Sequence, residues 1–165
     1  MTSEHLLHTI PPIYDGNSKI LILGSFPSVK SREVSFYYGH PQNRFWRVLA
    51  AVLGCAVPSS NEEKTALLHS HNIALWDVIK SCDIVGSSDS SIKNVVPNDI
   101  GTILSSCGIR QIYSNGKTSE KLFNKYIKDT VGRDTVALPS TSPANASYNL
   151  ERLTASWSVI KNNIR

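Results

Sequence analysis

The feature of this chain that most limits its fold is a short apolar run, Ile20–Leu23. It ends at Gly24 and leads into a long segment rich in Gly, Pro, Ser, aromatic and basic residues, Gly24–Asn43. An apolar run bounded by turn residues predicts a buried strand. A loop of this length inside a small domain is usually functional. Because open α/β sheets bind ligands at the carboxyl ends of their strands, we expect this loop to border a binding site.

Helices and strands are expected to alternate along the rest of the chain. Apolar residues recur every three or four positions over Arg44–Leu53 and Gly54 follows them, which predicts a helix. Similar signals predict further helices over 62–69 with a cap at Asn61, from Asn98 or Asp99 to Ser106, over 118–129 and over 150–164. Further strands are expected over 73–79, 110–113 and 135–138, whereas the Ser-rich residues 81–98 are expected to form a loop.

This alternation predicts a three-layer α/β/α fold with a central, mainly parallel sheet of four strands. Residues 1–165 are expected to form one domain, because a chain of this length can bury a core of its own. Parallel strands have all their carboxyl ends on one edge of the sheet. We therefore expect three loops to meet there in one crevice: Gly24–Asn43, Ser114–Gly116 and Pro139–Asn145.

The three loops together supply aromatic rings, side-chain amides and hydroxyls. This set suits a planar heterocycle that stacks on a ring and is read by an amide, with hydroxyls and backbone amides left for phosphates. The aromatic residues are Phe26, Phe36, Tyr37 and Tyr38, the amides are Asn43, Asn115 and Asn145, and the hydroxyls are Ser25, Ser28, Ser140, Thr141 and Ser142.

Charge is compatible with a nucleic-acid partner without demanding one. The net charge is +4 and the pI about 9.0, which permits a polyanionic partner. Lys30, Arg32, Arg44 and Arg47 flank the aromatic loop, although solvated positions on helix faces suit each of them equally well.

Several other kinds of protein fit the sequence poorly. No P-loop or GxGxxG motif follows the first strand, the histidines lack metal-ligand spacing, and Asp77 has no second nearby carboxylate for paired acid–base work. Cys55, Cys82 and Cys107 are widely spaced and are expected to be reduced thiols. With no secretion signal and no apolar run long enough to span a membrane, we expect a cytoplasmic protein without membrane, metal or cofactor.

Four motifs resemble those of one family. They are GSFPS after the first strand, HPQNRFW, SNG after the third strand and LPSTSPANA before the last helix. Together they resemble the uracil-DNA glycosylase superfamily, and are most similar to its hypoxanthine-DNA (DNA-deoxyinosine) glycosylase branch. The resemblance implies a monomeric enzyme that hydrolyses the N-glycosidic bond of a deaminated base in DNA, with hypoxanthine as the expected base and no metal or cofactor.

The resemblance also implies residue roles. Phe26 stands where the mismatch-specific branch has a water-orienting Asn, so Asn43 is expected to be the catalytic amide. Ser140 replaces the His or Asn of the second motif, and no Leu is present there to wedge into the duplex. Base binding is implied for Gly24, Ser25, Phe26, Pro27, Tyr38 and Asn115, with Tyr38 stacking on the base and Asn115 reading its edge. DNA contacts are implied for Ser28, Lys30, Arg44, Ser140, Thr141, Ser142, Pro143 and Asn145.

Simpler roles and other functions remain open at this point. Asn43 could cap the helix that starts at Arg44, Asn115 could serve the turn at Gly116, and 140–145 could be a rigid loop. The alternatives in function are a uracil or mismatch-specific glycosylase, a catalytically weak nucleic-acid binding module on the same fold, and an enzyme acting on free nucleosides or nucleotides.

Overall fold

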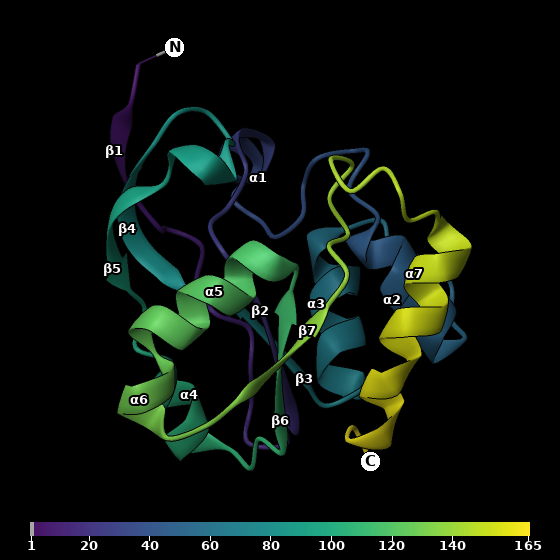
Figure 1. Ribbon diagram of the computed structural model, residues 1–165. Coiled ribbons are helices and arrows are strands. Elements are labelled where there is room, and N and C mark those ends of the chain that lie inside the picture. Colours follow the sequence, from purple (N-terminus) through teal and green to yellow (C-terminus); the bar gives the residue numbers. More distant parts are fainter. Residues whose placement is uncertain (1) are drawn as a thin grey trace.

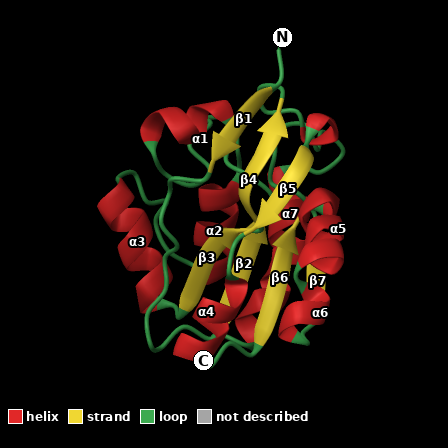
Figure 2. Ribbon diagram, turned by 90° about the vertical axis from the view of Figure 1, so that its left-hand side faces the viewer, coloured by secondary structure: helices red, strands yellow, loops and turns green. Residues whose placement is uncertain are grey.

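The computed structural model describes residues 2–165 and contains a parallel sheet of four strands. Its strands lie in the order β3 (Ile73–Asp77), β2 (Ile20–Gly24), β6 (Gln111–Asn115) and β7 (Thr135–Leu138), and every neighbouring pair is parallel. Figure 2 shows these strands side by side. The predicted four-stranded parallel sheet is therefore confirmed.

Helices cover both faces of this sheet, which gives the predicted three layers (Figure 1). Strand β2 shows why, because its alternate residues enter different cores: Ile20 and Ile22 on one side, Leu21 and Leu23 on the other. A strand that is covered on both faces needs an unbroken apolar run. One face carries α2 (Phe45–Leu53), α3 (Asn61–Ser70) and α7 (Leu150–Trp157), and the other carries α4 (Ile100–Ser106), α5 (Lys117–Tyr126) and α6 (Lys128–Val131).

A second sheet corrects one prediction. The residues expected to form a loop, 81–98, instead contain most of β4 (Ile79–Ile84), a 3-10 turn, η1 (Asp89–Ser91), and β5 (Lys93–Pro97). These strands form an antiparallel sheet with β1 (Glu4–Leu7), in the order β1-β4-β5. The strand predicted over 73–79 ends at Asp77, where the chain turns into β4. The buried positions of β4 include the polar Ser81, which is followed directly by buried Cys82, so the strand shows no regular alternation of apolar and polar residues. Its partner β1 is distant in the sequence.

Several predicted boundaries also shift. The aromatic loop contains a short helix, α1 (Val29–Val34), and the cap of α3 is Ser60 rather than Asn61. The helix predicted over 118–129 breaks at Ile127 into α5 and α6, and the last helix ends as a 3-10 turn, η2 (Ser158–Asn162). Across residues 2–165, no helix is long and apolar enough to cross a membrane.

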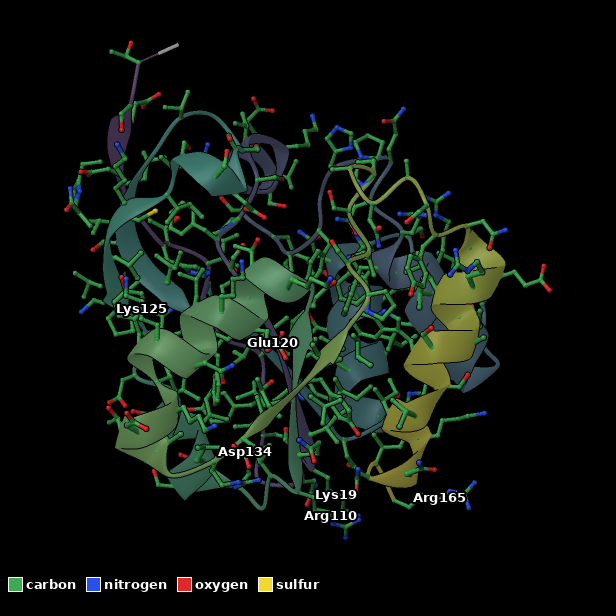
Figure 3. The ribbon with its side chains drawn as sticks, viewed as in Figure 1. Lys19, Arg110, Glu120, Lys125, Asp134 and Arg165 are labelled. Atoms are coloured by element: carbon green, nitrogen blue, oxygen red, sulfur yellow. The ribbon has the colours of Figure 1, made fainter. Side chains whose placement is uncertain are left out.

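The two ends of the parallel sheet differ in character. The loops after β2, β6 and β7 emerge at the end near α1 (Figure 1). Figure 3 shows Lys19, Arg110 and Arg165 gathered at the opposite end, where Lys19 precedes β2 and Arg110 precedes β6. This part of the positive charge therefore lies away from the three loops.

Candidate active site

The three loops line one pocket at the carboxyl end of the parallel sheet, as predicted. Its walls also include residues from the segment that was expected to be a plain loop, because β4 and η1 fold back beside the pocket. The lining residues are Gly24, Ser25, Phe26, Pro27, Ser28, Ser31, Tyr37, Tyr38, Asn43, Asp77, Ile84, Ser87, Asp89, Asn115, Ser140, Thr141 and Ser142.

The predicted site residues divide into two groups. All those expected to bind the base line the pocket, as does the expected catalytic residue, Asn43. Of the residues expected to contact DNA, Ser28, Ser140, Thr141 and Ser142 line it, whereas Lys30, Arg44, Pro143 and Asn145 do not.

Asn43 is held by its carbonyl oxygen. Its Oδ1 accepts the backbone N–H of Phe45 at 2.9 Å and the hydroxyl of Thr141 at 2.9 Å. The first contact lies at the start of α2, but the cap residue of this helix is Arg44 and the helix begins at Phe45, one residue later than predicted. A carbonyl oxygen has two lone pairs, and both are used here. Because no described residue accepts from the Nδ2 group, this donor is the part of Asn43 that remains available to a bound molecule.

Thr141 joins two of the loops through Asn115. Its backbone N–H donates to Asn115 Oδ1 at 3.0 Å, and its Oγ1 accepts from Asn115 Nδ2 at 3.0 Å. Thr141 is fully buried. Hydrogen bonds thus run from Asn115 through Thr141 to Asn43, and they fix the amides of both asparagines. Gly116 permits this arrangement, because it has φ of +95° and a Cβ there would lie 3.0 Å from Ser140 Cβ.

Arg44 has a role that the sequence did not indicate. Its guanidinium donates to the backbone carbonyls of Thr141, Ser142, Asn145 and Tyr148. Four of its five N–H donors are therefore occupied by the loop that precedes α7. In the structure Arg44 therefore stabilises that loop, and one N–H donor of its guanidinium is left for a DNA phosphate.

The aromatic residues of the first loop do not all face the pocket. Phe36 packs against the core and does not line the pocket. Tyr37 borders the pocket but is buried in the core, and its hydroxyl donates to the carbonyl of Pro11 at 2.8 Å. Tyr38 has a left-handed backbone, with φ of 54°, and stacks on Phe45 at 4.1 Å between ring centroids.

The Tyr38 hydroxyl points into the protein. It is buried and has no hydrogen-bond partner among residues 2–165. Burial, and then the nearby Asp77 carboxylate, raise the pKa of Tyr38 well above its usual value. Tyr38 therefore stays protonated and keeps a hydrogen-bond donor at the base of the pocket.

Two acidic residues that were not among the predicted site residues, Asp77 and Asp89, line the pocket. Asp77 lies at the end of β3 and its Oδ2 is 2.7 Å from His8 Nε2, with both side chains almost fully buried. Asp89 lines the same pocket and accepts from Ser25 Oγ at 3.5 Å. A second carboxylate, Asp89, therefore borders the same pocket as Asp77, which the sequence did not indicate. His8 and Asp77 are 69 positions apart, and no spacing rule connects them. Within residues 2–165, no group of three His, Cys, Asp or Glu side chains is arranged to hold a metal ion.

Comparison with known proteins agrees with this geometry. The sequence model of the uracil DNA glycosylase superfamily matches residues 11–162. The chain belongs to this superfamily. It is 36% identical over 137 residues to a hypoxanthine DNA glycosylase of Methanosarcina barkeri, covering 82% of this chain and 85% of the relative. A hypoxanthine DNA glycosylase of Methanosarcina acetivorans is 35% identical over 144 residues, covering 86% and 90% of the two chains.

A solved structure has the same fold. The solution NMR structure of a Methanosarcina acetivorans protein, named as a candidate uracil DNA glycosylase, matches with a TM-score of 0.79 and 33% identity. The match covers 92% of this chain and 94% of that one. Family and fold together support a DNA glycosylase that binds DNA, and they leave the choice of base to the details of the pocket.

Proposed function

We propose that this protein is a monofunctional DNA glycosylase that hydrolyses the N-glycosidic bond of deoxyinosine in DNA and so releases hypoxanthine for base excision repair. The observation that carries the proposal is Asn43, whose carbonyl is fully used by Phe45 and Thr141 and whose NH2 group is left for a base in the pocket. The hypoxanthine DNA glycosylases that resemble this chain over most of their length support the choice of base.

The reaction needs stabilisation of charge more than it needs a strong base. Hydrolysis of an N-glycosidic bond passes through an oxocarbenium-like state, as glycoside hydrolysis does. The departing base gains negative charge, and a donor aimed at it stabilises the transition state more than the bound substrate. The Nδ2 group of Asn43 is such a donor. A neutral amide removes no proton from water, so a modest rate is expected.

Excision of hypoxanthine is the direct test of this proposal. The protein is expected to release the base from an oligonucleotide containing deoxyinosine in the presence of EDTA, leaving an abasic site that alkali cleaves. Oligonucleotides containing deoxyuridine, deoxyxanthosine and deoxyadenosine serve as comparisons. An intact inosine strand, whichever base stands opposite, would contradict the proposal. Binding without cleavage would favour the catalytically weak binding module.

DNA affinity is expected to fall with salt, because contacts to phosphates release counterions. A slope of log affinity against log salt of roughly −2 to −4 is expected, at about −0.9 per neutralised phosphate. Lys30 lies on α1 beside the pocket. Within residues 2–165 its ammonium makes one ion pair, a long contact of 3.7 Å with Glu33, so it is largely free.

Replacing Lys30 by glutamine should therefore make the slope shallower by about one unit. Lys125 provides a control, because it lies in the last turn of α5, away from the end that carries Gly116 (Figure 3). Lys125→Gln should leave the slope unchanged. Equal slopes for wild type and Lys30→Gln would show that α1 does not face the DNA.

A further inference from the structure

Two polar side chains converge beneath Gly24 at the floor of the pocket. A Cβ added to Gly24 would lie 2.4 Å from Asp77 Oδ1 and 3.0 Å from the Tyr38 hydroxyl oxygen. Both atoms therefore lie within 3.0 Å of one point, and only a glycine leaves room for them. Gly24, Tyr38 and Asp77 all line the pocket.

The protein satisfies neither of these two polar atoms. The Tyr38 hydroxyl is buried without a hydrogen-bond partner among residues 2–165. Asp77 uses Oδ2 for His8, and no hydrogen bond from a described residue reaches its Oδ1. A buried polar group without a partner, as the Tyr38 hydroxyl is, is rare in folded proteins and calls for an explanation. A ligand that offers one donor and one acceptor side by side would satisfy both.

Asp77 is held firmly in place. His8 Nε2 lies 2.7 Å from Asp77 Oδ2, and the two side chains are 1% and 6% exposed. The backbone N–H of Val78 donates to the carbonyl of Gly24 at 2.9 Å, and Asn98 Nδ2 donates to the carbonyl of Asp77 at 2.9 Å. The carboxylate is thus fixed relative to Gly24. His8 lies before residue 11, where the match to the superfamily begins, so this support comes from outside the shared core.

Deamination creates the chemical pattern that such a floor would recognise. Conversion of adenine to hypoxanthine turns N1 from an acceptor into an N–H donor and replaces the neighbouring amine by a carbonyl. An ionised carboxylate can only accept a hydrogen bond, whereas a protonated phenol can donate one. Adenine would present the lone pair of N1 to the carboxylate, so the same floor would disfavour the undamaged base.

We propose that Asp77 Oδ1 and the Tyr38 hydroxyl read the imino N–H and the adjacent carbonyl of a deaminated base, and that His8 positions Asp77 for this contact. This inference rests on the proposed glycosylase function and adds to it two residues that determine specificity. Xanthine and uracil carry the same N–H and carbonyl pair, and so do guanine and thymine. This floor would therefore distinguish hypoxanthine from adenine, and other contacts must reject guanine and thymine.

The test compares two substrates that differ in this edge. Deoxyinosine carries the N1–H and the 6-carbonyl, whereas deoxynebularine, which contains unsubstituted purine, carries neither. Single-turnover excision rates are measured on both oligonucleotides. Asp77→Ala is expected to slow excision of hypoxanthine by about 10- to 100-fold, as for loss of one hydrogen bond to a charged group. Excision of purine should not slow, because the lone pair of its N1 faces the same carboxylate as that of adenine. The inosine-to-nebularine ratio should therefore fall by at least the same factor.

Two further variants separate recognition from folding. Tyr38→Phe removes a hydroxyl that has no protein partner, so it should fold normally and still lower the ratio. His8→Ala should lower the ratio without removing either recognition atom. The control is Asp83→Ala, because Asp83 makes a contact of the same 2.7 Å length with His5 on the solvent-exposed side of the antiparallel sheet. It should leave the ratio unchanged.

The outcomes distinguish this inference from the function on which it rests. If wild-type protein releases neither base, the proposed function fails and the inference fails with it. If it releases hypoxanthine but Asp77→Ala and Tyr38→Phe slow both substrates by one common factor, the function stands and base reading is overturned. Asp77 would then act on the attacking water or on the fold.

Discussion

Replacing Asn43 by aspartate is expected to abolish excision almost as completely as replacing it by alanine. Aspartate is the same size and keeps both acceptor contacts, with Phe45 N–H and the Thr141 hydroxyl. It loses the NH2 donor and adds a negative charge, which would oppose the charge that develops on the departing base. Removing one donor aimed at developing negative charge costs about two to three orders of magnitude in rate, and we expect both variants to fall in that range in single-turnover measurements on deoxyinosine DNA.

The aspartate variant decides between two roles for Asn43. If Asn43 oriented the attacking water through its oxygen, as the resemblance implied, a carboxylate would serve as well or better and activity would be retained. Asn43→Ala alone cannot make this distinction, and its loss of the contact with Phe45 N–H is expected to lower stability by about 1 kcal/mol. Gln42→Ala is the control, since Gln42 is an exposed neighbour outside the pocket. It should behave as wild type.

Replacing Arg44 by alanine is expected to have the largest effect on stability. The change leaves four backbone carbonyls of the 141–148 loop without their charged donor. Hydrogen bonds to charged groups contribute about 1.5–3 kcal/mol each. Water would satisfy some of these carbonyls in the variant, because part of the loop is exposed. We therefore expect the free energy of unfolding to fall by about 3 kcal/mol in total. For a protein of this size that corresponds to a decrease in Tm of about 6–12 °C, which thermal unfolding can measure.

Two variants sharpen this test. Arg44→Lys should recover little of the stability, because an ammonium group lacks the planar fork that reaches several carbonyls at once. Arg47→Ala is the matched control on α2. Among residues 2–165, the Arg47 guanidinium contacts two acceptors, the backbone carbonyls of Gln42 and Asn43, both at the long distance of 3.5 Å. If Arg44→Ala left the Tm unchanged and made the salt dependence of DNA binding shallower, Arg44 would instead contact a DNA phosphate, as the sequence predicted.

The parallel sheet could be predicted because its signals are local. Strand β2 is an unbroken apolar run closed by Gly24, and Ser114–Gly116 marks the end of β6 in the same way. The antiparallel sheet carries no such signal. Its central strand, β4, has no regular alternation of apolar and polar residues. It pairs with β1, for example Cys82 with Leu6, so the sheet joins distant parts of the chain. Long-range pairing of this kind depends on the whole fold rather than on a window of sequence.

The candidate site shows the same division between local and distant information. Sequence motifs were enough to bring Asn43, Asn115 and Tyr38 to one pocket. They could not show which atoms of those residues would be free, because that depends on Thr141 and on backbone groups that lie far away in the sequence. Arg44 was expected to bind phosphate for the same reason: its charge is visible in the sequence, and the carbonyls around it are not. The DNA contacts of Ser28, Lys30, Ser140 and Ser142 stay predictions.

The position of β1 matters for how this protein is handled. A version trimmed to the stretch shared with its superfamily, residues 11–162, would keep all four parallel strands and every motif that marks the family. It would also lack β1, so β4 would become an open sheet edge of the kind that invites self-association. Asp77 would at the same time lose its histidine neighbour. Strand β1 and His8 lie outside the residues shared with the superfamily, yet in the folded molecule they pair with β4 and support Asp77 behind the pocket.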